Sequence, residues 1–366
     1  MKRATIILVI LLCGLGGMVS ADEEIGVFAN TNTNCIQFIN PLGQTVSPPF
    51  LKGQLGTYGG GLFDVVIAPN GKTAIVSNFG DRKIFFIDIS GGFNAVPTLI
   101  GDGYVTFFAE DMDIIPPKTP NTKSKYVLVT DGGLSSVVAV MDYTQGKLVR
   151  RLSLRGRGAQ AVAVTPDGEL ALFADYARRA IHSYNIGDDG NLTFRETQLV
   201  APVSPVNIAI SPDGKTVIVP CVGYSLAPYF LIDSQHNLCY KGFIKMPTKN
   251  GQSCVFSADS ETAYYLSNSQ NKGTVVNVLK VLPGKVTPFG NPIPVEPMRG
   301  TSQLFGVDTM AIDPNGENLY VTNPTVSGGI AAVSVINIKM TPTPMQVDLW
   351  RTVGIPTGIA FGTIKK

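Results

Sequence analysis

Apolar residues lie along the chain in short runs of four to six, separated by Gly, Pro, Asn and Asp. One unit places such runs at 64–68, 73–78, 84–88 and near 95–100, with Pro69, Asn70 and Gly71 between the first two. This turn supplies the positive φ angle that a tight hairpin needs. Because no window after residue 22 shows a helical period, the pattern predicts four short antiparallel strands per unit and almost no helix.

The unit recurs along the chain. The turn returns at 166–168, 212–214 and 314–316. The strand after the turn ends in a four-residue pattern with seven copies: VFAN (27–30), IVSN (75–78), LVTD (128–131), LFAD (172–175), IVPC (218–221), YLSN (265–268) and YVTN (320–323). Every copy but the fifth closes with Asn or Asp, whose side chains accept hydrogen bonds from nearby backbone and are expected to hold the following loop. A repeat of about 40–50 residues built from short strands is typical of a β-propeller.

The inner strands of these units are expected to begin near 64, 111, 161, 207, 253, 308 and 358. The seventh lies at the C-terminus and has no outer strands after it, whereas 27–30 and 36–40 at the N-terminus align with 75–78 and 84–88 without gaps. Pairing the two ends in one blade would close the ring and remove the unpaired edges that a linear stack would expose. We therefore predict an all-β fold: one domain over 22–366, a seven-bladed β-propeller of four-stranded antiparallel blades, closed by the N- and C-terminal segments in one blade.

The turns of the type S-P-D-G-K at 211–215, followed by strands of the type YVTN, resemble the YVTN-repeat β-propeller family over essentially all of 22–366. Proteins of this group resemble exported or surface-layer propellers, lactonase-type propellers and quinoprotein amine dehydrogenase-type propellers. The resemblance implies the fold and leaves the activity open among these branches. The dehydrogenase branch is the least favoured, because the cofactor ligands are missing from the sequence.

The N-terminus has the features of a secretory signal. Lys2 and Arg3 precede an apolar run, and the small residues Ser20 and Ala21 provide a cleavage site. We predict a signal peptide at 1–21 and an exported protein that is periplasmic, at the cell surface or secreted. The apolar run is shorter than the roughly 20 residues that span a bilayer, so no transmembrane segment is expected after cleavage. The net charge of +2 gives no strong signal for nucleic acid, and a monomer is expected.

Four cysteines remain after cleavage: Cys35, Cys221, Cys239 and Cys254. An even number in an exported chain permits two disulfides, with three possible connectivities. Any bridge is expected among the last three, which fall in adjacent units. Buried free thiols are the alternative.

The first residues of the inner strands should converge on the mouth of a central channel. They lie on the face that also carries the loops between second and third strands, called the upper face below. Six positions there carry oxygen-bearing side chains: Asp64, Asp111, Gln160, Asn207, Gln252 and Asp308. Convergent oxygens suit Ca²⁺, Mg²⁺ or a polar ligand, and neighbouring carboxylates shift one another's pKa into the range for acid–base work. A polar, water-filled rim is the alternative.

Four arginines are expected on the same face beside the third unit: Arg155, Arg157, Arg178 and Arg179. Arginine suits carboxylate or phosphate groups, and the alternative is solvated charge or pairing with Asp175 and Asp131.

Several catalytic signatures are missing from the sequence. With only two histidines, a multi-histidine zinc or copper site is not expected, and no Gly-x-Ser-x-Gly or P-loop motif occurs. The sequence favours an exported, noncatalytic propeller that presents its upper face and channel mouth to a protein, glycan or small polar ligand. The alternative is a lactonase-like hydrolase in which a divalent metal at the channel mouth acts as Lewis acid and a carboxylate as general base.

Overall fold

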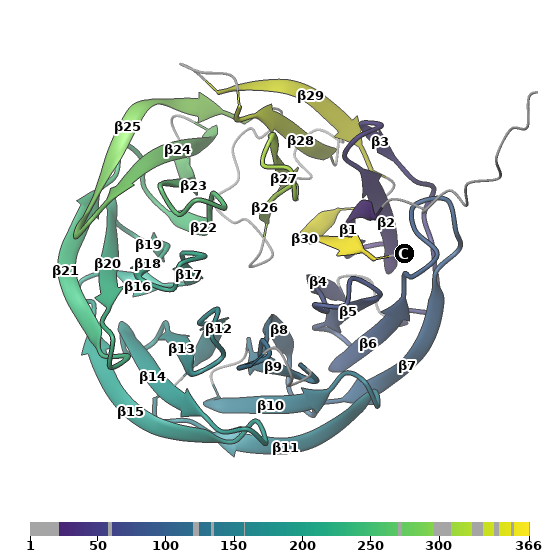
Figure 1. The fold of residues 1–366 in the computed structure, drawn as a ribbon, viewed down its shortest axis with the longest axis horizontal. Coiled ribbons are helices and arrows are strands. Elements are labelled where there is room, and N and C mark those ends of the chain that lie inside the picture. Colours follow the sequence, from purple (N-terminus) through teal and green to yellow (C-terminus); the bar gives the residue numbers. More distant parts are fainter. Residues whose placement is uncertain are drawn as a thin grey trace, which may run out of the picture.

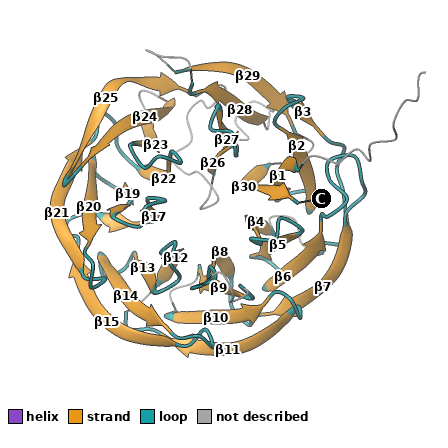
Figure 2. Ribbon diagram, viewed as in Figure 1, coloured by secondary structure: helices purple, strands orange, loops and turns teal. Residues whose placement is uncertain are grey.

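The computed structural model describes residues 22–57, 61–119, 124–132, 135–156, 158–269, 273–295, 309–323, 332–339, 344–352 and 355–365. The strands form seven four-stranded antiparallel sheets, arranged as blades around a central axis (Figure 1). Within the described ranges there is no helix (Figure 2). The predicted fold class is confirmed.

Each blade runs from its inner to its outer strand. Blade 1 contains β4 (Leu62–Ile67), β5 (Thr73–Asn78), β6 (Lys83–Asp88) and β7 (Thr98–Tyr104). Blade 2 contains β8 (Ala109–Ile114), β9 (Tyr126–Asp131), β10 (Val137–Asp142) and β11 (Lys147–Ser153). Blade 3 contains β12 (Ala159–Val164), β13 (Leu170–Asp175), β14 (Ala180–Ile186) and β15 (Leu192–Leu199). Blade 4 contains β17 (Ala209–Ile210), β18 (Thr216–Ile218), β20 (Leu226–Ile232) and β21 (Leu238–Lys245), beside the short pair β16 (Ser204–Pro205) and β19 (Cys221–Val222).

The remaining three blades complete the ring. Blade 5 contains β22 (Gly251–Phe256), β23 (Thr262–Ser269), β24 (Gly273–Leu282) and β25 (Lys285–Pro294). Blade 6 contains β26 (Met310–Ile312), β27 (Asn318–Asn323), β28 (Ala332–Asn337) and β29 (Met345–Arg351). Blade 7 contains β30 (Pro356–Ile364), β1 (Glu23–Asn30), β2 (Cys35–Asn40) and β3 (Thr45–Val46).

The second strand of each repeat is apolar because it is buried on both faces. In β5, Ile75 and Val76 are both fully buried. Ile75 packs into the apolar cluster shared with blade 2, and Val76 packs into the cluster shared with blade 7. Successive strand residues point to opposite faces, so one strand supplies apolar side chains to two blade interfaces. This explains why the pattern shows a continuous apolar run instead of alternation.

The third residue of the four-residue pattern links neighbouring blades in three copies, through the hydroxyls of Ser77, Thr130 and Thr322. Ser77 donates a hydrogen bond to the carbonyl of Glu110 in blade 2 at 3.2 Å. Thr322, in the YVTN copy itself, donates to the carbonyl of Thr357 in blade 7 at 2.5 Å. Each hydroxyl satisfies a buried carbonyl at the start of the next inner strand, which sets the spacing of the blades at the upper face.

The last residue of the pattern holds the loop that follows, as expected. Asn78 Oδ1 accepts the N–H of Asp81 at 2.8 Å, and Asn78 Nδ2 donates to the carbonyl of Leu55 at 2.8 Å. Asp175 Oδ1 accepts the N–H of Arg178 at 2.8 Å. The terminal side chains of the sixth and seventh copies lie outside what the structure describes.

The ring closes where the two ends of the chain share blade 7, consistent with the prediction. β1 pairs antiparallel with β30, and Gly26 lies opposite Phe361. β30 also packs closely on the inner strand of blade 1, because a Cβ atom at Gly358 would lie 2.6 Å from the Cα atom of Asp64. Glycine is therefore required at 358 for the closing blade to seat against blade 1.

Gly358→Ala is expected to lower the free energy of unfolding by about 2 kcal/mol, because the added methyl group must push apart two backbone segments. Gly101→Ala is the matched control, since a Cβ atom at this strand glycine would meet no atom within 4 Å. Chemical denaturation of both variants measures the difference. Equal stabilities would contradict the close approach of β30 and β4.

The fourth strand of the first unit, expected near 95–100, is present but begins later, because β7 runs from Thr98 to Tyr104. Gly92 has a φ of 77°, its N–H bonds the carbonyl of Ile89, and the Ala95 N–H bonds the carbonyl of Gly92. Consecutive turns therefore occupy the segment where the strand was expected, and the strand begins only after them.

Candidate functional site

The central channel contains a cavity of about 380 Å³, to which all seven inner strands contribute. Its lining is mostly apolar, with residues such as Val66, Val164 and Ile359. Asp113 is the one charged residue among the described lining residues. Its carboxylate accepts the N–H groups of Ile114 and Val164, each at 2.7 Å. Most side chains of this cavity are therefore apolar, and the carboxylate of Asp113 is engaged with backbone N–H groups.

The start of the inner strand is irregular in blades 1, 2, 3 and 5, where pairing with the second strand shifts register. Such a bulge changes the direction of the side chains at the shift. Two successive positions therefore have different surroundings. The first position of each pair holds Phe63, Glu110, Gln160 and Gln252, and the second holds Asp64, Asp111, Ala161 and Ser253. Four of the six candidates from the sequence fall at these positions: Gln160 and Gln252 at the first, and Asp64 and Asp111 at the second.

Asp64 and Asp111 occupy the second position and connect adjacent blades. Asp64 is fully buried; its carboxylate accepts the N–H of Val65 at 2.7 Å and that of Met112 in blade 2 at 3.0 Å. Asp111 is buried, and its Oδ2 accepts the N–H of Val162 in blade 3 at 2.7 Å. These bonds satisfy backbone groups of the next inner strand, which gives both aspartates a role in blade-to-blade packing.

The other candidates have more varied positions. Asn207 is buried in blade 4, and Gln252 is partly buried in blade 5. Asp308 lies outside the described residues. The structure therefore describes five of the six candidates, and their convergence on one ligand stays a prediction.

Glu110 is the functional candidate that sequence reasoning missed. Its side chain is 7 % exposed, its Oε1 accepts a hydrogen bond from the Gln160 amide at 3.2 Å, and its Oε2 has no hydrogen-bond partner among the described residues. Burial raises its pKa from 4.5 to about 7, against the lowering effect of the Gln160 bond, and the charge of Asp131 raises it further. The sequence signal that could have identified Glu110 is the pair of adjacent acids at 110 and 111, of which only Asp111 was predicted to lie at the channel mouth.

A row of aromatic rings lies beside Glu110. A Cβ atom at Gly132 would be within 3 Å of both Glu110 Oε2 and the ring edge of Phe79, so the carboxyl and this ring are neighbours. Phe79 stacks on Phe108 with ring centroids 4.8 Å apart and contacts Phe63 at 5.5 Å. Phe63 also packs against the apolar cluster of blades 3 and 4, although it belongs to blade 1. Its ring therefore reaches across the mouth of the channel.

The predicted arginine cluster is only partly described. Arg155 is exposed, and its guanidinium lies 4.2 Å from the ring centroid of Phe194 on the outer strand β15. Arg178 and Arg179 are exposed in the loop between β13 and β14 and form no ion pair with a described residue. Arg157 lies outside the described residues. The Arg178 contact with Asp175 is made by its backbone N–H, not by its guanidinium.

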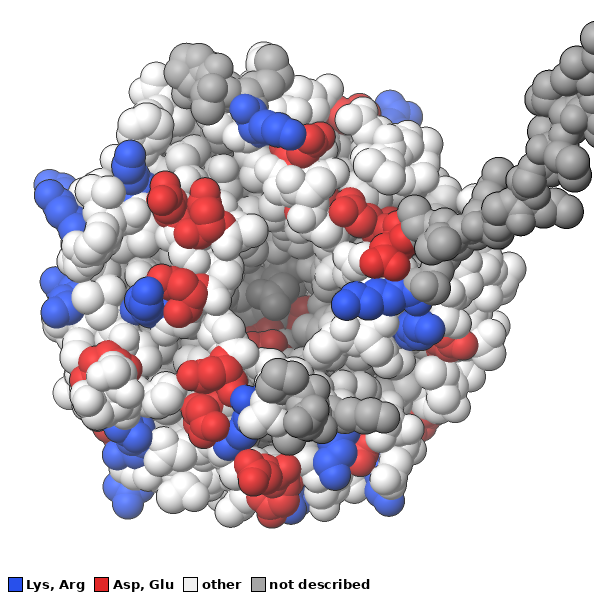
Figure 3. Space-filling view, in the orientation of Figure 1, with Lys and Arg blue, Asp and Glu red and all other residues white. Residues whose placement is uncertain are grey.

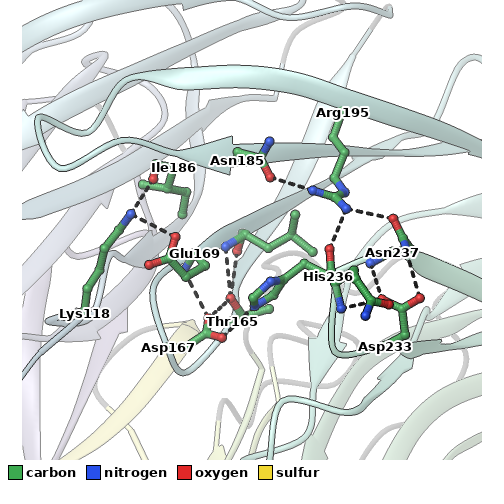
Figure 4. Close-up of polar contacts among 12 residues, drawn as sticks. Lys118, Thr165, Asp167, Glu169, Asn185, Ile186, Arg195, Asp233, His236 and Asn237 are labelled. Atoms are coloured by element: carbon green, nitrogen blue, oxygen red, sulfur yellow. Dashed lines mark hydrogen bonds and ion pairs between the residues drawn. The ribbon is translucent and has the colours of Figure 1, made fainter.

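Polar contacts at the opposite, lower face connect blades 3 and 4 (Figure 4). Arg195 on β15 donates to the Gln235 carbonyl at 2.5 Å and to Asn237 Oδ1 at 2.7 Å, both in the outer turn of blade 4. His236 in that turn lies 2.8 Å from Asp167 in the first turn of blade 3. These contacts are exposed or half-exposed links between turns, and we assign them a structural role.

On the face drawn in Figure 3, basic and acidic side chains intermingle, and acidic side chains border one side of the central hollow. The other histidine, His182, is buried and lies 3.1 Å from Asp175 and 2.8 Å from Thr197. This histidine joins two strands within blade 3 and is remote from solvent.

The described residues do not offer an obvious metal centre. No group of three or more His, Cys, Asp or Glu residues suited to a metal ion occurs among them, and the carboxylates of Asp64 and Asp111 are engaged with backbone N–H groups. The Ca²⁺ or Mg²⁺ site that the sequence suggested stays a prediction, because Asp308, one of its expected ligands, lies outside the described residues.

The four cysteines within the described residues are free thiols, and Cys35, Cys221 and Cys254 are buried. The disulfides that the sequence permitted are therefore absent among them. No helix of the described ranges is long and apolar enough to cross a membrane. The predicted signal peptide at 1–21 lies outside those ranges.

Comparison with known proteins identifies the class of fold. No family model matches the chain, and no curated protein matches it in sequence. Solved structures do match. A protein of unknown function from Desulfotomaculum acetoxidans has a TM-score of 0.76 at 17% identity, covering 92% of this chain and 98% of that chain. The periplasmic gluconolactonase of Pseudomonas aeruginosa has a TM-score of 0.71 at 14% identity, with coverages of 93% and 99%.

A Bacteroides fragilis protein assigned as a 6-phosphogluconolactonase also matches, with a TM-score of 0.71 at 15% identity and coverages of 94% and 99%. At these identities the likeness establishes the fold alone. The chain is therefore a seven-bladed β-propeller with the same fold as these proteins.

Proposed function

We propose that this protein is an exported hydrolase that opens a lactone or related cyclic ester at the upper mouth of its channel, with Glu110 as general base. The observation that carries the proposal is the buried Glu110 carboxyl, which is positioned by Gln160 and has one oxygen without a partner among the described residues. The fold likeness to a periplasmic gluconolactonase supports both the reaction class and export. Fold alone does not define activity, so the site has to supply the chemistry.

The residues present suit a base-assisted hydrolysis. A carboxylate with a pKa of about 7 is substantially ionised at neutral pH and is basic enough to accept a proton from water. The Gln160 amide holds Oε1, which leaves Oε2 as the oxygen to take that proton. The activated water attacks the lactone carbonyl carbon, and the ring C–O bond breaks. The ring oxygen then takes up a proton, so that lactone and water give one hydroxy acid.

Two other hypotheses remain as proposals. In the first, a noncatalytic propeller binds a protein, glycan or small polar ligand at the same face. In the second, a lactonase-like hydrolase uses a divalent metal at the channel mouth as Lewis acid. The first is less favoured because a simple binding surface has no need of a buried carboxyl with a raised pKa. The second is less favoured because no group of three or more His, Cys, Asp or Glu residues that could hold a metal ion occurs among the described residues.

The test is a hydrolysis assay on the purified chain lacking residues 1–21, with a panel of γ- and δ-lactones across pH 5 to 9. We expect kcat/KM to rise with pH through about 7 and then to level off, because Glu110 is active only when deprotonated. Metal analysis and assays with a chelator accompany the panel. Activity that is lost on chelation and restored by Ca²⁺ or Mg²⁺ would favour the metal mechanism, and no turnover of any lactone would leave binding as the function.

A further inference from the structure

The surface leading to Glu110 is aromatic over its described extent. Phe108 is 36% exposed, and its ring stacks on Phe79 at 4.8 Å with an interplanar angle of 19°. The Arg82 guanidinium lies 4.7 Å from the centroid of Phe108. Phe63 extends the row to the channel mouth. Exposed, stacked aromatic rings next to a polar group are the usual lining of sites for partly apolar small molecules.

The electrostatic surroundings of the Glu110 carboxyl favour an uncharged ligand. The groups that shift the pKa of Glu110 are its own burial, the Gln160 amide and the Asp131 carboxylate, and no basic side chain is among them. The described arginines nearest in sequence to the site stack on aromatic rings, Arg82 on Phe108 and Arg155 on Phe194. A phosphate group would need converging cationic donors, and the carboxylates of Glu110 and Asp131 would repel it.

Resting on lactone hydrolysis at Glu110, we propose that the site selects lactones that carry an extended apolar substituent over phosphorylated or fully hydroxylated sugar lactones, and that Phe79 and Phe108 bind this substituent. The lactone ring then lies at the channel mouth with its carbonyl next to Glu110. The substituent runs outward along the row of rings, where it is removed from water. The preference would therefore appear mainly in KM, since the rings touch a part of the substrate that does not react.

The experiment compares δ-decalactone, δ-valerolactone and glucono-δ-lactone as substrates, and the corresponding alkyl and unsubstituted δ-lactams as ligands that are not hydrolysed. We expect kcat/KM for δ-decalactone to exceed that for δ-valerolactone by about tenfold or more, from burial of the alkyl chain. Phe108→Ala should remove most of this advantage through KM, and Phe108→Leu should restore part of it. Phe289→Ala is the matched control, since Phe289 is 58% exposed on β25 of blade 5, and it should retain the full preference.

The outcomes separate this inference from the proposed function. Lactam binding that favours the alkyl form and depends on Phe108 supports the aromatic site, even if no lactone is hydrolysed and the enzymatic proposal fails. Hydrolysis that depends on Glu110 but shows equal kcat/KM for δ-decalactone and δ-valerolactone, or prefers glucono-δ-lactone, overturns the aromatic site and leaves the enzymatic proposal standing. A Phe108→Ala variant with an unchanged preference overturns it as well.

Discussion

Replacing Glu110 by Gln is expected to lower kcat/KM for lactone hydrolysis by about two to four orders of magnitude, the usual contribution of a positioned general base. The amide has nearly the same shape and retains a carbonyl oxygen to accept the Gln160 hydrogen bond, so the loss should appear in kcat with little change in KM. The rise of activity through pH 7 should disappear with it.

Glu110→Gln should lower the activity but raise the free energy of unfolding at alkaline pH. The pKa of Glu110 is raised in the folded protein, from 4.5 to about 7. The folded form therefore binds the proton more tightly, and this contribution is complete below pH 4.5 and is lost as pH rises through about 7. At about 1.4 kcal/mol for each pKa unit, the carboxylate costs about 3 kcal/mol at alkaline pH. Glu110→Gln should thus be more stable than wild type at pH 9.

Denaturant unfolding at pH 5 and pH 9, with the hydrolysis assay on the same samples, measures both effects. Glu261→Gln is the matched control, because this glutamate is exposed in the first turn of blade 5, and it should change neither quantity. A Glu110→Gln variant that keeps its activity would rule out the general base. Equal stability of wild type and variant at pH 9 would mean that the carboxyl is better solvated than its burial implies.

Replacing Asp64 by Ala is expected to lower the free energy of unfolding by about 2–5 kcal/mol. Two buried N–H groups, those of Val65 and Met112, lose the carboxylate that accepts their hydrogen bonds, and each unsatisfied group costs about 1–3 kcal/mol. Because Met112 belongs to blade 2, the loss weakens the contact between two blades in addition to the local strand. The measurement is denaturant unfolding at neutral pH.

Two controls define the meaning of this result. Asp188→Ala removes a side chain that is 96% exposed and should change stability by less than about 1 kcal/mol. Asp64→Asn keeps one acceptor oxygen and should recover part of the loss. If Ca²⁺ or Mg²⁺ raised the melting temperature of wild type but not of Asp64→Ala, Asp64 would instead be a metal ligand, as the sequence first suggested.

Much of the architecture was predictable because its causes are local. The turns at 69–71, 166–168 and 212–214 need glycine at positive φ, and the strands between them are apolar in runs, so number and type of strands follow from short segments. Ring closure was also predictable, since the N-terminal copy lacks an inner strand and the C-terminal copy lacks outer strands. The fourth strand of the first unit was misplaced because consecutive turns around Gly92 carry no strong apolar signal.

The sequence by itself determined the ring of seven repeats, because short segments within each repeat specify its strands and turns. It also restricted the site to the starts of the inner strands. Only the tertiary structure decided which of the adjacent residues Glu110 and Asp111 bonds the next blade and which lies at the channel mouth. Glu110 and Asp111 are both acids at one strand start, yet a shift of register aims Asp111 at blade 3 and leaves Glu110 at the channel mouth beside Phe79. That choice depends on contacts between blades far apart in the chain, and no local pattern encodes them.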